Sequence, residues 1–164
     1  MLKNTLLSLL KLTLPLALLC SKPVFAATLD HDEASAYANF IQNLVNKSTL
    51  TKKGALCIYG HDSVAKSLES GAGNVLIQDG SSDFHHRCKA IYISVDSVKN
   101  LKVRLGEMAS HKILTISTYE EFVEDGGMIQ VGMGRRDFEL TVDVRLLHSA
   151  QIKLDTLSTN LIIN

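Results

Sequence analysis

The sequence predicts a three-layer α/β fold, in which helices flank a mostly parallel sheet and an antiparallel hairpin follows near the C-terminus. Short continuous apolar runs alternate with helical segments over residues 55–124, as in parallel sheets whose strands are joined by covering helices. After Gly126 and Gly127, two segments alternate apolar and polar residues, which is typical of strands with one wetter face. These glycines supply the left-handed residue that a helix end followed at once by a strand requires.

An amphipathic helix is predicted over residues 28–46. Asp30, Asp32 and Glu33 suit its first turn, where negative charge meets the positive end of the helix dipole. Apolar side chains recur at helical spacing and form one stripe. The residues of this stripe are Ala34, Tyr37, Ala38, Ile41, Leu44 and Val45.

The middle of the chain repeats a strand and a helix. Each predicted strand is a short apolar run of the kind that is buried on both faces. Asp62 or Ser63 is expected to cap the first helix of this part, and Ser97 the second. In chain order, we expect a strand over 55–59, a helix ending at Gly71, a strand over 74–78 and a polar loop over 79–83. A strand over 89–95 follows, and then a helix whose inner face is Val98, Leu101, Leu105 and Met108. This part of the chain ends with a strand over 111–117 and a short helix over 118–124.

The last third of the chain changes character. Residues 128–133 and 137–143 predict two strands, joined by a hairpin turn over 134–136. Weaker helical spacing follows over 145–150 and 157–163. We therefore expect an antiparallel pair with one wetter face, followed by two short helical segments.

Residues 1–26 have the pattern of a cleavable signal peptide. A positively charged start precedes a short apolar core over 12–20, and a small residue, Ala26, stands before the expected cut at Ala27. The apolar core is shorter than the roughly 20 residues of a membrane-spanning helix, although an uncleaved anchor is the alternative. We therefore expect export, and one domain over residues 27–164.

The charge balance excludes two classes of partner. Cleavage removes three lysines and no acidic residue, so the formal net charge falls from +0 to −3. Nucleic-acid binding requires a basic face, and electrostatic attachment to anionic lipid requires a polybasic stretch. We therefore expect neither nucleic-acid binding nor direct insertion into a membrane.

Two cysteines, Cys57 and Cys88, remain after cleavage. An even cysteine count in an exported protein favours a disulfide, and a bridge of this span would stabilise by roughly 3–4 kcal/mol. The alternative is two buried thiols, because free cysteine is among the most buried residue types.

The densest set of candidate metal ligands is the run from His85 and His86 to Cys88. Imidazole and thiolate suit zinc or copper. A structural site needs four ligands, however, and the sequence offers no second compact group. We therefore interpret the run as a polar loop leading into a strand, and expect no metal or other cofactor.

His61 and Asp62 follow the first strand and so fall at the carboxyl edge of the predicted sheet, where open α/β folds bind ligands. A structural role as a helix cap is nevertheless favoured over ligand binding, because Asp is a preferred cap residue. The sequence carries neither a dinucleotide-binding glycine motif nor a phosphate-binding loop, and no serine stands in a nucleophile elbow. We therefore do not expect an enzyme.

Four segments together form a pattern seen in a known family. They are Tyr37–Phe40 in the opening helix, the cysteine-bearing strand Leu56–Gly60, the strand that starts at Cys88, and Phe122–Ile129 with its Gly-Gly-Met-Ile run, which is followed by Phe138–Glu139 and a terminal Leu157–Leu161. On these motifs the chain resembles the YfiR-like family of small periplasmic proteins.

This resemblance implies a periplasmic regulator that represses an inner-membrane diguanylate cyclase. Such a protein would bind the periplasmic sensor domain of the cyclase and lower cyclic-di-GMP and biofilm formation. The resemblance also maps the family's disulfide onto Cys57 and Cys88. The alternative function is a periplasmic small-molecule binding protein that serves a transporter or sensor through the sheet edge near Gly60. The oligomeric state stays open, a homodimer being one alternative.

Overall fold

The structure of the chain is a computed structural model that describes residues 30–78, 83–94, 100–154 and 160–163. The predicted signal peptide with its cut between Ala26 and Ala27, most of the predicted loop over 79–83, and the predicted cap Ser97 with Val98 lie outside these residues. No helix among the described residues is long and apolar enough to cross a membrane.

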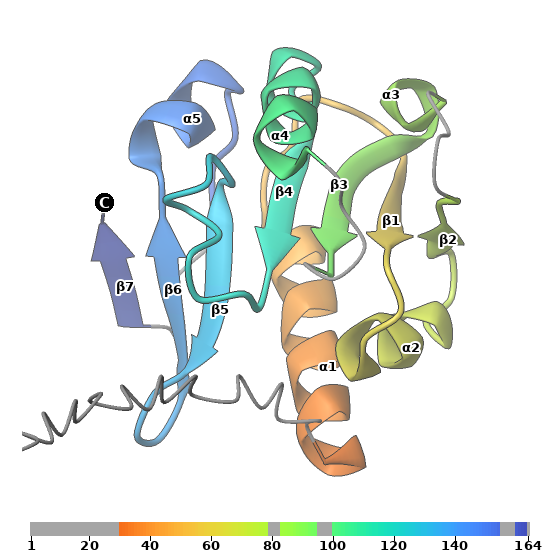
Figure 1. Cartoon of the computed structure of the whole chain (residues 1–164), viewed down its shortest axis with the longest axis vertical. Coiled ribbons are helices and arrows are strands. Elements are labelled where there is room, and N and C mark those ends of the chain that lie inside the picture. The colour runs from red at the N-terminus through yellow and green to blue at the C-terminus, as the bar shows by residue number, and fades with distance from the viewer. Residues whose placement is uncertain (1–29, 79–82, 95–99, 155–159, 164) are drawn as a thin grey trace, which may run out of the picture.

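Seven strands of the described residues form a single sheet (Figure 1). Their bounds are β1 Ala55–Tyr59, β2 Val75–Leu76, β3 Cys88–Ile93, β4 Leu114–Ser117, β5 Ile129–Met133, β6 Phe138–Val142 and β7 Asn160–Ile163. They lie in the order β2-β1-β3-β4-β5-β6-β7. All neighbouring pairs are parallel except the hairpin of β5 and β6.

Helices cover both faces of this sheet. Their bounds are α1 His31–Lys47, α2 Ser63–Glu69, α3 Phe84–Arg87, α4 Leu101–Ser110 and α5 Val144–Ser149. Leu56 and Ile58 of β1 pack in the core under α1 and α2. Cys57 and Tyr59 point to the opposite face and pack with Leu105 of α4. The predicted fold class, a three-layer and mostly parallel α/β fold with an antiparallel hairpin, is confirmed.

Helix α1 forms as its apolar spacing predicts. Asp30 precedes it, and its side chain accepts a hydrogen bond from the backbone N–H of His31 at 2.6 Å. Every residue of the predicted stripe is buried. In addition, Phe40 stacks on Phe138 of β6 with ring centroids 4.3 Å apart, which ties the helix to the hairpin.

Two predicted helices are wrong. The segment over 118–124 forms consecutive turns rather than a helix. Its hydrogen bonds mix spans of three and four residues, such as Phe122 N–H to the Tyr119 carbonyl and Asp125 N–H to the Glu121 carbonyl. A segment this short forms a helix only if packing supports it, and here the packing instead buries the Phe122 side chain completely.

The second wrong prediction is the helix over 157–163. Residues 160–163 form β7, which pairs in parallel with β6, with Glu139 opposite Asn160 and Val142 opposite Ile163. Ile162 and Ile163 are β-branched and prefer a strand, and an open sheet edge outweighs weak helical spacing.

Several element boundaries differ from the predicted ones. The strand predicted over 111–117 begins only at Leu114, because the chain leaves α4 in a turn. Helix α4 begins at Leu101, after Asn100 in a left-handed conformation (φ 61°). Strand β2 is limited to Val75 and Leu76.

Candidate functional site

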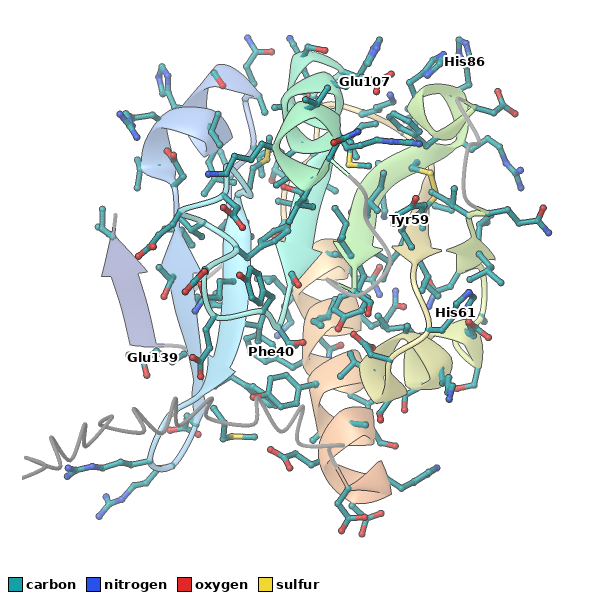
Figure 2. All side chains as sticks on the ribbon, viewed as in Figure 1. Phe40, Tyr59, His61, His86, Glu107 and Glu139 are labelled. Carbon is teal, nitrogen blue, oxygen red and sulfur yellow. A yellow bond between two sulfur atoms is a disulfide. The ribbon has the colours of Figure 1, made fainter. Side chains whose placement is uncertain are left out.

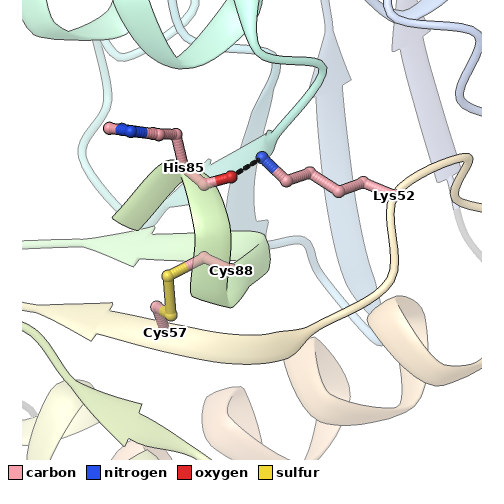
Figure 3. The surroundings of a disulfide bond; sticks show 4 residues. All are labelled: Lys52, Cys57, His85 and Cys88. Atoms are coloured by element: carbon pink, nitrogen blue, oxygen red, sulfur yellow. Dashed lines mark hydrogen bonds between the residues drawn. A yellow bond between two sulfur atoms is a disulfide. The ribbon is translucent and has the colours of Figure 1, made fainter. Parts of the chain in front are cut away.

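A disulfide joins Cys57 of β1 to Cys88, the first residue of β3 (Figure 3). The two Cα atoms lie 5.6 Å apart, and both residues are completely buried. The bridge therefore links neighbouring strands on the sheet face that packs with α4. Neither sulfur is available as a nucleophile or a metal ligand.

The ring of His85, close in sequence to this bridge, contacts the rings of two other histidines and stacks on one of them. The ring centroid of His85 lies 4.4 Å from that of His86 and 4.9 Å from that of His111, whose ring is nearly parallel to it at 18°. The Nδ1 atom of His85 is buried and has no hydrogen-bond partner among the described residues. No group of three or more His, Cys, Asp or Glu side chains in the described ranges is arranged to hold a metal ion.

Lys52 holds the segment before β1 against this region. Its Nζ atom donates a hydrogen bond to the backbone carbonyl of His85 (Figure 3). Partial burial lowers the pKa of Lys52. The polar groups around the bridge therefore fasten α3 to the chain segment that enters β1.

A hydrogen-bonded chain of three side chains lies at the carboxyl ends of the parallel strands. Asp62 Oδ1 accepts from the backbone N–H of Ala65 at 2.7 Å and so caps α2. Asp62 Oδ2 accepts from the hydroxyl of Tyr92 at 2.8 Å. The Tyr92 oxygen also lies 3.1 Å from Thr118 Oγ1. Because the phenol has one proton and gives it to Asp62, the Thr118 hydroxyl is the donor of this last bond.

This chain of side chains occupies the switch point of the sheet. From β1 the chain first adds β2 on one side and then crosses back to add β3 on the other side, so the connections diverge between β1 and β3. Open α/β folds bind ligands outside the strand ends at such points. Asp62 caps α2, which is the structural role that the sequence favoured. Tyr92 and Thr118 were not predicted, because Tyr92 bonds to Asp62 across 30 positions of the sequence and Thr118 bonds to Tyr92 across 26.

Burial raises the pKa of Tyr92, and the nearby Asp62 charge raises it further. In the unfolded chain the same phenol ionises near its ordinary pKa of about 10. Above that pH the folded state binds more protons than the unfolded state, so the free energy of unfolding falls as pH rises.

We predict that Tyr92→Phe flattens this alkaline loss of stability. At neutral pH the variant should lose about 1 kcal/mol, because Asp62 Oδ2 loses its donor. Denaturant unfolding of both proteins at neutral pH and above the ordinary tyrosine pKa measures the two effects. Parallel curves for the two proteins across the alkaline range would contradict the prediction.

His61 and His86, both singled out in the sequence, lie at opposite ends of the sheet (Figure 2). His61 is exposed beside Asp62, and it contacts none of the other histidines among the described residues. His111 joins His85 instead, although 26 positions separate the two in the chain. No local pattern could have shown this pairing.

One comparison with known proteins gives a match. A family model described as YfiR/HmsC-like matches residues 34–157, from the first turn of α1 to beyond the end of α5. No curated protein matches the chain.

Proposed function

The chain belongs to the YfiR/HmsC-like family, and from this premise we propose that it represses an inner-membrane diguanylate cyclase. The family is one of periplasmic regulators of diguanylate cyclase signalling. In our proposal the protein binds the periplasmic sensor domain of the cyclase and so lowers cyclic-di-GMP and biofilm formation. The observation that carries the proposal is the family match over residues 34–157, which includes all described elements except the start of α1 and β7.

The contacts of the polar groups support action by binding. Cys57 and Cys88 are engaged in the disulfide, and Asp62 is engaged as a helix cap and as the acceptor for Tyr92. These groups hold the scaffold together. A repressor on such a scaffold shifts its partner toward the inactive state by binding that state more tightly.

The test is to delete the gene in a strain that carries the cognate cyclase. We expect cellular cyclic-di-GMP and biofilm to rise, and both to return when the wild-type gene is restored. The measurement is the cyclic-di-GMP level, together with a pull-down of the mature protein from solubilised membranes. An unchanged level and a pull-down without cyclase would defeat the proposal.

Histidine variants serve as matched controls in that strain. Single changes of His61, His85 and His86 to Ala should restore repression to nearly the wild-type level, since none is assigned a direct role. Loss of repression in a variant that stays folded would contradict this assignment.

We also propose that the mature protein starts at Ala27 and acts in the periplasm. The disulfide supports this location, because such bridges persist in oxidising compartments. N-terminal sequencing of the exported protein should therefore begin at Ala27. A start at Met1, or recovery only with membranes, would show that the N-terminal segment is retained.

A further inference from the structure

A groove of about 500 Å³ runs between α1 and α2. Its residues on α1 include Ala34 and Ser35, which stand four and three positions before Ala38 and so lie on the same side of the helix as Ala38. Ser63, Lys66 and Ser67 do the same on α2. The volume falls in the range of small-molecule sites, which is roughly 300–1,000 Å³.

The described lining of the groove carries a cationic group and several hydroxyl groups but no carboxylate. The walls offer serine hydroxyls and the Lys66 ammonium group, while the buried methyl groups of Ala34 and Ala38 form an apolar floor. Lys66 forms no ion pair within the part of the chain that the structure describes, and no carboxylate among the described residues lines the groove. The imidazole of His31 and the carboxamide of Asn39 complete the polar lining. The groove therefore presents hydroxyl, carboxamide and imidazole partners to a ligand, with the Lys66 ammonium group as a cationic anchor.

Hydrogen bonds of Asn74 and Asp62 hold the helices of the groove in place. Asn74 Nδ2 donates to Gln42 Oε1 of α1 at 2.9 Å and to the Leu68 carbonyl of α2 at 2.7 Å. Asp62 caps α2 and accepts from Tyr92, which ties α2 to β3. Asn74 thus links α1 to α2 while Asp62 anchors α2 on the sheet, which reduces the ordering cost of binding.

We propose that this groove is a binding site for a small polyhydroxylated carboxylate, the chemical class of the sugar acids. The carboxylate pairs with Lys66, the ligand hydroxyls exchange hydrogen bonds with Ser35, Ser63 and Ser67, and the C–H face of the ligand rests on the alanine floor. A neutral sugar leaves Lys66 without its anion. An amino acid brings an ammonium group for which the lining has no carboxylate partner.

The probe for the first experiment is glucuronate, added to the mature, disulfide-bonded protein. Backbone amide NMR shifts should change on α1 and α2 around Ala34, Ala38 and Ser67, and they should saturate. Glucose, acetate and inorganic phosphate, each at the same ionic strength, should bind at least about tenfold more weakly, because each lacks either the anion or the ring of hydroxyls.

Two pairs of variants then test the anchor and the volume. Lys66→Gln should weaken glucuronate binding about tenfold, the usual effect of losing one charge-assisted hydrogen bond, whereas Lys47→Gln at the end of α1 should not. Ser35→Leu should block the groove, and Asn43→Leu, on α1 outside the groove lining, should leave binding intact. Circular dichroism checks that each variant is folded.

Three outcomes would overturn the proposal: no saturable shifts with glucuronate, equal binding of acetate or phosphate, or full binding by a folded Lys66→Gln protein. All three are measured on the purified protein without a cyclase. Failure here would therefore leave the proposed repressor function standing, and a failed deletion experiment would leave this site standing.

Discussion

Replacement of both Cys57 and Cys88 by alanine is expected to lower the free energy of unfolding by about 2–5 kcal/mol, as removal of native disulfides from small exported domains does. The bridge joins β1 to β3 in the buried interior and closes a loop across 31 positions of the chain. Opening that loop restores conformational freedom to the unfolded chain. Urea unfolding of the variant and of the oxidised wild-type protein measures the loss.

Reductant provides the matched control for this change. The wild-type protein unfolded in the presence of reductant should behave as the double variant does, and reductant should not affect the variant. On the proposed function, the double variant should resemble the gene deletion in cells, because a destabilised protein is degraded before it binds the cyclase. Labelling of two free thiols in the unfolded wild-type protein, without reductant, would show that the bridge is absent.

Gly127→Ala is expected to destabilise the protein by about 1–3 kcal/mol, the usual cost of adding a methyl group to a closed core. A Cβ atom at position 127 would lie 2.2 Å and 2.3 Å from two ring carbons of Phe122. Phe122 is completely buried, so its ring has no free space to occupy. Thermal and denaturant unfolding of the variant should show the loss.

Two further glycine variants separate overpacking from backbone strain. Gly106→Ala lies inside α4 with open space around it, so it should stabilise the protein by about 0.5–1 kcal/mol. Gly126→Ala meets no atom within 4 Å but has φ +99°, so it should cost only the strain of its backbone. If Gly127→Ala were as stable as the wild-type protein, the close packing of this turn would be contradicted.

The elements predicted correctly are those that local patterns determine. The stripe from Ala34 to Val45 fixes the inward face of α1, and the run over 55–59 gives β1 with the same bounds. The wrong predictions, over 118–124 and 157–163, concern short segments whose spacing fits more than one structure. In both cases contacts distant in sequence decide, namely the burial of Phe122 and the pairing of β7 with β6.

The site could be predicted from the sequence only in part, for the same reason. Asp62 caps α2 through Ala65, three positions away, and a capping pattern of this kind is local. Tyr92 reaches Asp62, and Thr118 reaches Tyr92, only because parallel strands bring their carboxyl ends to one edge. The α1–α2 groove likewise depends on how two helices pack, which no single helix pattern records.

The strand order has a consequence for how the chain assembles as it emerges from synthesis or translocation. Strand β2 adds to one side of β1 and β3 adds to the other side. After β3, each new strand adds beside the strand that precedes it in the chain. The growing sheet therefore never has to open to admit a later strand. Cys57 and Cys88 lie on β1 and β3, the second pair of neighbouring strands to appear after β1 and β2, so an oxidant can cross-link β1 to β3 when little more than half of the chain has appeared. The hairpin of β5 and β6, and then β7, would be added to a sheet in which β1 and β3 are already joined by the disulfide.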